Sequence, residues 1–202
     1  RARGLLLDAR HLGIAQRVVI RVISPRLQQD AKAVEVFHRE VGTLSALDSN
    51  HVARILDAGS LDDGSLYLVR EYLDGVSAVS HSGDGDLGID DALTLFMQVC
   101  EAVQQAHACR IVLRDLQPAH VFVTTPRNGT TVAKITDFGT CKVMRDDTTS
   151  EELSCTRMLG LSSSASPELV RQEQTFDSRA DVWSLGCLLY QLVTGRPAFS
   201  GA

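Results

Sequence analysis

The pattern of apolar and polar residues in the first third of the chain predicts a small sheet with one helix. Two apolar runs, GLLLDAR and QRVVIRVI, lie within residues 1–23, and Gly13 in the HLGIA between them can supply a turn. Residues 31–47 repeat apolar side chains at helical spacing. This stripe consists of Val34, Phe37, Val41, Leu44 and Leu47. Residues 51–75 then predict two more strands around the turn Asp62-Asp63-Gly64.

The rest of the chain has mainly helical periodicity. Asp90 and Asp91 can cap a helix that continues through ALTLFMQVCEAVQQAHA, with His107 near its C-terminal end. Its apolar stripe is predicted to contain Leu93, Phe96, Met97, Cys100, Val103 and Ala106. Residues 178–193 predict a second helix, apolar on most sides, as a central buried helix would be. Residues 77–88 are rich in Ser, Gly and Asp without an apolar period, which predicts a flexible surface loop.

Residues 111–139 predict a hairpin between these helices. VFV and VAKIT are short strand-like runs, and TTPRNGTT between them is rich in turn residues. Asp115 and Asp137 then stand at the two outer ends of the hairpin. Taken alone, such a hairpin does not distinguish a functional site from a solvated turn, so the motifs around it decide its interpretation.

Composition and charge narrow the class of protein. The chain has 202 residues, of which 44% are hydrophobic, so it can bury a core in one or two lobes. A formal charge of −5 without long runs of one sign gives no signal for nucleic acid or an anionic membrane. No long apolar run or signal-like segment is present, so we expect neither a membrane segment in this chain nor export. Five cysteines without a C-x-x-C pair predict a reducing compartment and hence a cytoplasmic location.

Four motifs in one order connect the hairpin to a known family. Arg114-Asp115 is followed by the DFG beginning at Asp137, by SPE at residues 166–168, and by D-x-W-S-x-G beginning at Asp181. This order resembles the catalytic half of protein kinases, and in particular the eukaryotic-like Ser/Thr kinases of bacteria. Their catalytic loop usually reads H-R-D-L-K-P-x-N, where this chain has LRDLQPAH. The resemblance also implies that Asp181 forms hydrogen bonds with the main chain of this loop.

The resemblance implies an α+β, two-lobed fold. We expect a small β-rich N-lobe with one helix in residues 1–73, a hinge and flexible loop in residues 74–89, and a mostly helical C-lobe in residues 90–202. The first two glycines of the phosphate-covering loop are absent, and so are the helices that normally follow the central one. We therefore expect a degenerate kinase domain that is truncated at both ends.

The resemblance also implies catalytic and metal-binding roles. Asp115 takes the position of the catalytic base, and Asp137 that of a Mg²⁺ ligand. His120 takes the position of the second metal ligand, usually Asn. Arg21 replaces the lysine that binds phosphate, and Glu40 is its expected helix partner. Two alternatives stay open: an Arg21–Glu40 pair with a purely structural role, and a Glu40 that is only a solvated surface residue.

A nucleotide site is implied in the same way. Gly4 aligns with the third glycine of the phosphate-covering loop, and Glu71 lies in EYLDG, which resembles the hinge. Val19 and Phe122 stand where the family sandwiches adenine, and both add bulk. Arg70 takes the gatekeeper position. Its long cation either projects behind the adenine or extends outward along the sheet.

Two functions of different classes are compatible with these residues. An active ATP-dependent Ser/Thr protein kinase would use Asp115 as base and Asp137 as Mg²⁺ ligand. A pseudokinase would keep the fold as a signalling or binding module for a protein partner. Leu113 and His120 replace two polar residues of the catalytic loop, and imidazole suits Mg²⁺ poorly. The sequence therefore favours the pseudokinase, with ATP and Mg²⁺ implied by the resemblance alone.

Overall fold

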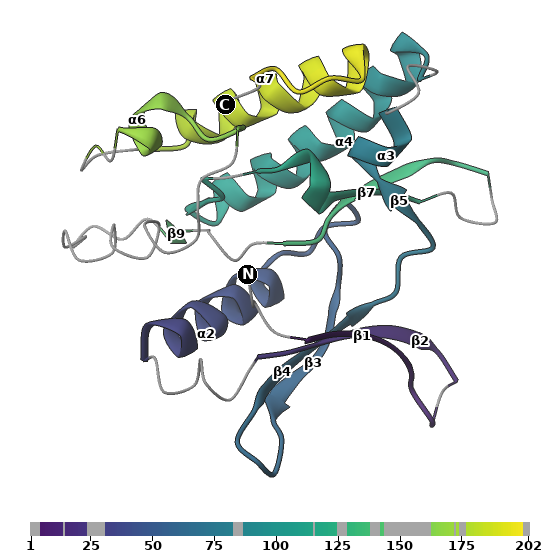
Figure 1. Ribbon diagram of the computed structural model, residues 1–202, viewed down its shortest axis with the longest axis vertical. Coiled ribbons are helices and arrows are strands. Elements are labelled where there is room, and N and C mark those ends of the chain that lie inside the picture. The colour runs from purple at the N-terminus through teal and green to yellow at the C-terminus, as the bar shows by residue number, and fades with distance from the viewer. Residues whose placement is uncertain are drawn as a thin grey trace. The chain divides into compact units, whose positions relative to one another are not determined.

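The chain forms two compact units (Figure 1). In the computed structural model, unit 1 comprises Arg1–Ala46 and Ala53–Leu73, and unit 2 comprises Leu47–Val52 and Asp74–Ala202. The structure describes residues 5–13, 15–23, 31–82, 87–114, 116–124, 129–137, 142–143, 163–171, 173 and 177–199. The short segment 47–52 thus belongs to unit 2 although the chain on both sides of it belongs to unit 1.

Unit 1 is an antiparallel sheet with one helix along one face (Figure 1). The strands are β1 (Leu5–Arg10), β2 (Arg17–Val22), β3 (Ile55–Ser60) and β4 (Leu66–Glu71), in the order β1-β2-β4-β3. The helix is α2 (Ala31–Ala46). Ile23, Phe37 and Leu68 form the buried centre between sheet and helix. The predicted strands and helix of the N-lobe are confirmed.

The turn between β3 and β4 forms at the predicted residues. Gly64 has a φ of 84°, a conformation that glycine adopts without steric strain. The Oδ1 atom of Asp63 accepts a hydrogen bond from the main-chain N–H of Ser65 at 2.8 Å. Hydrogen bonds from Ser65 hold the pKa of Asp63 below its usual value, because they favour the ionised carboxylate.

Unit 2 combines helices with short strands. Its two long helices are α4 (Ile89–Ala108) and α7 (Arg179–Thr194), which pack against each other (Figure 1). One sheet has the order β5 (Gly75–Ser77), β7 (Val121–Thr124), β8 (Val132–Ile135), and β6 (Ile111–Val112) pairs with β9 (Lys142–Val143). In the described part of unit 2, the other elements are α3 (Ala78–Ser82), the 3₁₀ helix η1 (Pro118–His120) and α6 (Pro167–Val170). The predicted hairpin is β7 and β8, and the predicted central helix is α7.

The core face of α4 differs from the predicted stripe. Its buried residues are Ala92, Leu95, Val99, Ala102, Val103 and Ala106. Leu93 and Met97, predicted to face the core, are 43% and 58% exposed. The helix packs against both α7 and β8, and small residues let it approach them closely. The prediction followed the largest apolar side chains and therefore missed this alanine-rich face.

Two local predictions around α4 are wrong. Gly88 is the N-cap residue and makes no side-chain cap bond, whereas Asp90 and Asp91 lie inside the first turn. In the first turn, their carboxylates interact favourably with the positive end of the helix dipole, but they form no capping hydrogen bond. Residues 77–88 were predicted to be a loop, yet they begin with the end of β5 and the helix α3. The Ser77 Oγ atom accepts a hydrogen bond from the N–H of Ser80 at 3.2 Å, which caps α3.

Hydrogen bonds fasten β8 on two sides. The side-chain amide of Gln98, in α4, donates to the carbonyl oxygen of Thr131 at 3.1 Å and accepts from the N–H of Ala133 at 2.7 Å. On the other side, the Ile135 N–H donates to the His51 carbonyl oxygen at 2.9 Å. Val52 forms a parallel bridge with Ile135. These bonds explain why residues 47–52 belong to unit 2.

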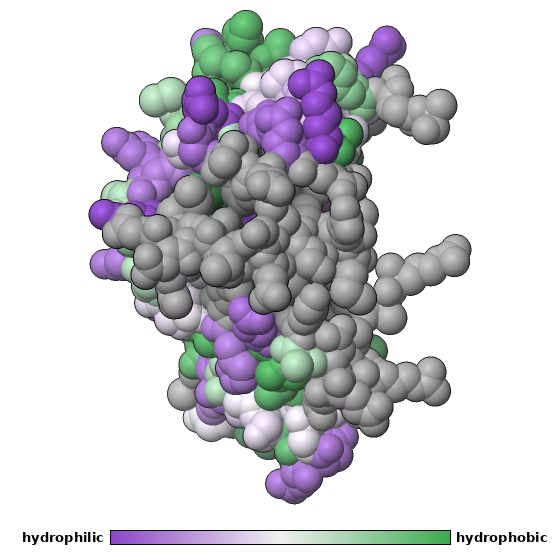
Figure 2. Space-filling model, turned by 90° about the vertical axis from the view of Figure 1, so that its left-hand side faces the viewer, coloured by the Kyte–Doolittle hydropathy of each residue, from purple (hydrophilic) through white to green (hydrophobic). Residues whose placement is uncertain are grey.

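Several apolar side chains of α7 are exposed. In the upper part of Figure 2, where Figure 1 places helices of unit 2, apolar residues (green) lie on the surface among hydrophilic ones (purple). The exposed apolar residues of α7 and of the segment after it are Val182, Trp183, Tyr190, Val193 and Phe199. The rings of Trp183 and Phe199 stack with centroids 5.4 Å apart, so the chain after α7 folds back along the helix.

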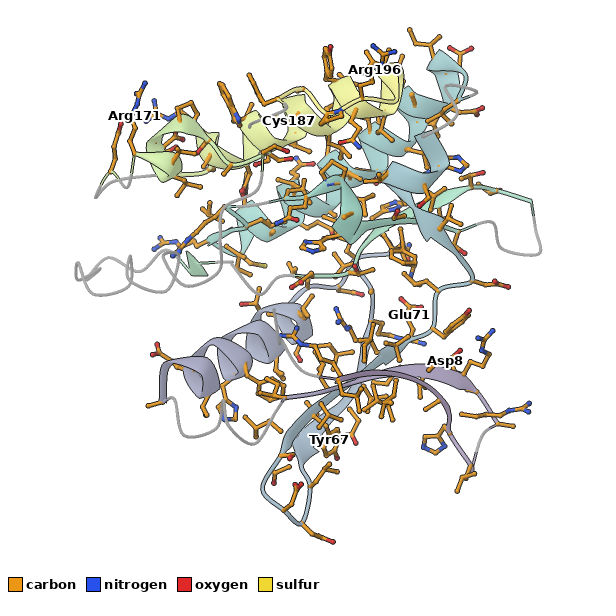
Figure 3. All side chains as sticks on the ribbon, viewed as in Figure 1. Asp8, Tyr67, Glu71, Arg171, Cys187 and Arg196 are labelled. Atoms are coloured by element: carbon orange, nitrogen blue, oxygen red, sulfur yellow. The ribbon has the colours of Figure 1, made fainter. Side chains whose placement is uncertain are left out.

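Three cysteines in the described part of the chain, Cys100, Cys109 and Cys187, are free thiols. Burial raises the pKa of the thiols of Cys100 and Cys187 (Cys187 is labelled in Figure 3), because desolvation disfavours the thiolate. Cys141 and Cys155 lie outside the described residues. Within the described part, no helix is both long and apolar enough to cross a membrane.

Gly75 provides a test of the β5–β7 pairing. A methyl group on Gly75 would collide with the carbonyl oxygen of Val123 and would lie 2.9 Å from the Cα atom of Thr124. We expect Gly75→Ala to lower the free energy of unfolding by about 1–3 kcal/mol, because these backbone atoms must move apart. Urea unfolding followed by circular dichroism measures this change.

Gly186→Ala is the matched control. Gly186 lies in α7, and apart from its chain neighbours and the backbone of the helix itself, no described atom lies within 4 Å of the position that its Cβ would take. Since alanine favours helix over glycine by about 0.5–1 kcal/mol, this variant should be as stable as the unaltered chain or slightly more stable. A Gly75→Ala variant with the same unfolding midpoint as Gly186→Ala would contradict the close pairing of β5 with β7.

Candidate active site

A buried carboxylate holds the predicted catalytic loop. Asp181, in the first turn of α7, has no solvent exposure. Its oxygens accept hydrogen bonds from the main-chain N–H groups of Leu113 at 2.9 Å and Arg114 at 2.7 Å. The sequence resemblance gave Asp181 this role, and the structure confirms it. Both donors are main-chain groups, so the bonds do not depend on the side chains of the loop.

His107 completes this network, and the sequence did not predict its role. Its Nε2 atom lies 2.8 Å from Oδ2 of Asp181, and because a carboxylate can only accept, the imidazole is the donor. His107 was interpreted only as a residue at the C-terminal end of α4. Its partner lies 74 residues further along the chain, and no local spacing indicates such a contact.

Arg114 has an unusual backbone conformation. Its φ is 69°, in the left-handed region, where a residue other than glycine is strained by roughly 1–3 kcal/mol. The side chain is 3% exposed, and its N–H is held by Asp181. This conformation turns the chain immediately before Asp115, which lies outside the described residues. The predicted role of Asp115 as base therefore stays a prediction.

Main-chain hydrogen bonds bring His120 close to Asp137. His120 ends η1, and its N–H donates to the carbonyl oxygen of Gln117 at 2.9 Å. The carbonyl oxygen of His120 accepts from Thr136, at 2.8 Å from the main-chain N and 3.0 Å from Oγ1. Since Thr136 precedes Asp137, the two predicted metal ligands lie side by side. His120 Nε2 is 3.7 Å from Asp137 Oδ2, and the two side chains are 24% and 17% exposed.

In unit 1, the sheet register places three predicted site residues on one face. Val19 in β2 is paired with Arg70 in β4, and Arg21 is paired with Leu68. Residues paired across a sheet, or two apart along a strand, point to the same face. Leu68 packs with Phe37 of α2, so Val19, Arg21 and Arg70 all point to the helix side of the sheet.

The burial of Arg70 bears on one of its two predicted positions, and the position behind the adenine stays a prediction. Arg70 is only 9% exposed, so it does not extend outward into solvent. Arg21 is half-buried. The side chain of Glu40 and the whole of Gly4 lie outside the described residues, so the Arg21–Glu40 pair and the role of Gly4 stay predictions.

The predicted hinge residue, Glu71, is the last residue of β4 and forms hydrogen bonds with the main chain of Arg54. Its Oε1 atom accepts from the main-chain N–H of Arg54 at 2.9 Å, and its own N–H donates to the Arg54 carbonyl oxygen at 3.0 Å (Glu71 is labelled in Figure 3). The guanidinium of Arg17 lies over the ring of the next residue, Tyr72, with its Cζ atom 3.6 Å from the ring centroid. Arg17 also pairs with Asp8, whose hydrogen bond raises the pKa of the guanidinium.

The remaining predicted residue, Phe122, lies in unit 2. It is half-buried in β7, between Ser77 of β5 and Lys134 of β8. The structure thus brings predicted site residues together within each unit. Val19 and Arg70 are paired in unit 1, and His120 and Asp137 are adjacent in unit 2.

Comparison with known proteins decides the family. Residues 2–202 match the family model described as protein kinase domain. The chain belongs to the protein kinase family. Unit 1 contains the β-rich N-lobe elements of a kinase domain, and unit 2 contains the helical C-lobe elements.

Similar curated proteins are bacterial Ser/Thr protein kinases. A probable serine/threonine-protein kinase of Corynebacterium efficiens is 32% identical over 197 residues, covering 96% of this chain and 29% of that protein. Kinase PknB of Mycolicibacterium smegmatis is 32% identical over 198 residues, covering 96% and 31%. Kinase pkn3 of Myxococcus xanthus is 32% identical over 200 residues, covering 97% and 36%. The chain spans about a third of the length of these relatives.

Protein kinases normally use ATP and Mg²⁺, and the donor atoms here only partly suit that metal. The Asp137 carboxylate is a suitable ligand because Mg²⁺ binds oxygen in an octahedral shell. The His120 imidazole is not suitable, since it offers nitrogen where a kinase offers an amide oxygen. Among the residues that the structure describes, no group of three or more His, Cys, Asp and Glu side chains is placed to hold a metal.

Asp181 is the residue on which the loop geometry should depend. We expect Asp181→Ala to lower the free energy of unfolding by about 3–5 kcal/mol, the usual effect of removing one partner from a buried, charged network. The substitution leaves two buried N–H groups and an imidazole without their acceptor. Chemical denaturation of the purified chain measures the loss.

Asp177→Ala is the control for this prediction. Asp177 lies just before α7, and its exposed carboxylate forms an ion pair with Arg179 at 3.0 Å. Because the pair is exposed, its removal should change the free energy of unfolding by about 1 kcal/mol or less. Equal losses in the two variants would show that the Asp181 network does not hold the loop.

Proposed function

We propose that the chain is a catalytically impaired Ser/Thr protein kinase domain that acts as a signalling or binding module for a protein partner. The observation that carries this proposal is the pair of donor atoms at the metal position. His120 Nε2 lies 3.7 Å from Asp137 Oδ2, where Mg²⁺ requires oxygen ligands. Phosphoryl transfer consists mainly of positioning and charge neutralisation, so a mismatched metal position affects its central requirement.

The nucleotide-facing positions of unit 1 support the same conclusion. The family has a small residue at the position of Val19, and Arg70, paired directly with Val19, adds a long cation on the same face. Adenine sites are largely apolar, so a charged side chain there opposes binding. Arg21 keeps the charge of the usual lysine but replaces a compact ammonium with a broad planar fork.

The framework of the domain is retained, as a binding module requires. Asp181 still holds the loop at Leu113 and Arg114, and the buried residues of α4 and α7 still form a core. The interactions that position the loop persist, whereas Arg21, Arg70 and His120 replace the side chains that the family usually has at these positions. A domain under selection for folding and partner binding alone would show this combination.

An active kinase is the second candidate function. It is favoured by the intact anchoring of the loop before Asp115 and by the retention of Asp137. In this alternative, Asp115 accepts the proton of the substrate hydroxyl. The two candidate functions differ in the rate at which the chain transfers the γ-phosphate of ATP to a protein, and this rate can be measured.

Restoring three side chains tests catalysis directly. The variant Arg21→Lys, Arg70→Met and His120→Asn returns the lysine, an apolar gatekeeper and the amide ligand. We expect the unaltered chain to transfer the γ-phosphate of ATP to a generic protein substrate far more slowly than the roughly 1–100 per second of active kinases, and the triple variant to be faster. Transfer of radiolabelled phosphate measures both rates.

A matched triple variant controls for non-specific effects. Arg171→Met, Arg196→Lys and His81→Asn make the same types of substitution at exposed positions (Arg171 and Arg196 are labelled in Figure 3). This control should have the rate of the unaltered chain. If the unaltered chain transfers phosphate within the range of active kinases and Asp137→Asn abolishes this activity, the pseudokinase proposal is wrong.

Nucleotide binding can be measured separately from catalysis. A ligand at 100 times its dissociation constant stabilises a protein by about 2.7 kcal/mol. We expect millimolar ATP with Mg²⁺ to leave the thermal unfolding of the unaltered chain almost unchanged and to stabilise the restored triple variant, because only the latter has the usual donor atoms. A large stabilisation of the unaltered chain that disappears in Asp137→Asn would overturn the expected weak binding.

A further inference from the structure

We propose that an exposed side of α4 is a docking surface for a basic amphipathic helix of a partner protein. The surface is centred on three apolar residues, Ile89, Leu93 and Met97, which form the α4 ridge. The inference names the class of partner for the proposed binding module, so it rests on that part of the proposed function. It does not depend on whether the domain transfers phosphate.

The α4 ridge is exposed although its side chains are large and apolar. Ile89, Leu93 and Met97 are 62%, 43% and 58% exposed. They recur at every fourth position, so their side chains form one continuous row along the surface of the helix. A single exposed apolar residue is common in soluble proteins, whereas a contiguous group of them is typical of an interaction surface.

The elements that pack against α4 do not cover this row. α4 packs on α7 and β8, and its buried face includes the small residues Ala92, Ala102 and Ala106. Leu93 and Met97 lie outside that face, so the packing of the described elements does not explain why large apolar side chains occur there. Contact with a further protein surface would remove them from water, which is favourable.

The shape of the α4 ridge favours a helix as its occupant. Side chains spaced by four residues form the kind of ridge that fits into the groove of a second helix, which is the commonest way in which helices pack in globular proteins. The flexible side chain of Met97 can adapt to the surface it meets. A partner strand would instead need an open sheet edge, and the middle of a helix has its main-chain groups bonded internally.

Charges beside the ridge favour a basic partner. Asp90 lies three positions before Leu93, and Glu101 lies four positions after Met97, so both carboxylates are neighbours of the ridge on the helix surface. The Glu101 side chain is 61% exposed, although it lies 3.5 Å from Nε2 of His51. α4 contains three acidic residues and no Lys or Arg. Basic residues along the edge of a partner helix would therefore meet charges of opposite sign.

The exposed apolar residues of α7 lack such charges. Val182 and Tyr190 are 61% and 49% exposed, comparable to the residues of the α4 ridge. The one acidic residue of α7, Asp181, has no solvent exposure and is hydrogen-bonded to the catalytic loop. A basic helix should therefore prefer α4 to α7, and substitutions in α7 provide the matched control.

The test uses the unaltered 202-residue chain and a labelled synthetic peptide of about 18 residues, which corresponds to five helical turns. The basic probe has leucine on one face and lysine on the other, and the acidic probe has glutamate in place of lysine. Fluorescence anisotropy measures binding, and circular dichroism measures the helix content of the peptide. We expect the basic probe to bind at one site per chain and to become helical. The acidic probe should bind at least about tenfold more weakly, because like charges repel.

Substitutions in α4 locate the binding site. The double variant Leu93→Gln, Met97→Gln removes two apolar contacts and should weaken binding of the basic probe at least about tenfold. The double variant Asp90→Asn, Glu101→Gln should also weaken binding and make it less sensitive to added salt, because salt screens the charges that this variant removes. Circular dichroism verifies that each variant is folded, and Ile89→Gln replaces the first double variant if that variant does not fold.

The control in α7 is the double variant Val182→Gln, Tyr190→Gln. It makes the same type of substitution at equally exposed positions and should bind the basic probe as the unaltered chain does. Equal losses in this control and in the Leu93→Gln, Met97→Gln variant would overturn the inference. Unchanged binding in the Leu93→Gln, Met97→Gln variant, or equal binding of the acidic and basic probes, would also overturn it.

Sedimentation of the chain without peptide tests the other possible occupant. A dimer that the Leu93→Gln, Met97→Gln variant abolishes would show that a second copy covers the α4 ridge, and the inference would then be wrong. We expect the chain to be a monomer at the concentrations used for anisotropy. These variants change no residue of the candidate active site. Absence of peptide binding would therefore refute the docking surface alone, whereas phosphate transfer in the range of active kinases would refute the impaired kinase alone.

Discussion

The geometry of unit 2 depends on one carboxylate that is completely removed from water. A charged group in such a position is stable only when hydrogen bonds replace its hydration, and Asp181 obtains three of them. These bonds join the start of α7, the end of α4 and the loop that follows β6. They also hold the strained backbone of Arg114 in place. The hydrogen bonds that this buried carboxylate requires therefore fix the residues at which the chain enters the catalytic loop.

The kind of donor in this network explains how the loop can change its side chains without losing its shape. Two of the three donors are main-chain N–H groups, which every residue except proline supplies. Leu113 can therefore replace the usual histidine and still donate to Asp181. His120 is held in the same manner, through its own N–H and carbonyl oxygen. Chemistry, by contrast, needs particular side-chain atoms, so it can be altered while the framework stays intact.

Local patterns made much of the fold predictable. The strands of unit 1, helix α2 and the β7–β8 hairpin follow from alternation, helical spacing and turn residues, which act over a few positions. Helix α3 was missed because its signal is a serine cap rather than an apolar period. The buried face of α4 was missed because close packing selects Ala102 and Ala106 over larger residues.

The candidate site was predictable in its residues but not in its contacts. Ordered motifs identified Asp137, His120 and Asp181. They did not indicate that His107 binds Asp181, because that contact joins residues that are 74 positions apart. The register that pairs Val19 with Arg70 likewise depends on which strands become neighbours, and the strand order β1-β2-β4-β3 cannot be read from any one segment.

The assignment of residues 47–52 to unit 2 has a consequence for the order in which the protein can assemble during synthesis. His51 and Val52 bind β8, and the contact between His51 and Ala133 joins residues 82 positions apart. At roughly 5–20 residues per second, a ribosome needs about 4–16 seconds to produce that distance of chain. During this interval the connection between α2 and β3 has no strand to bind, and Val52, 3% exposed in the finished fold, faces water. The N-terminal sheet is thus translated first, but residues 47–52, between α2 and β3, can bind their partner strand only after the β7–β8 hairpin has been made.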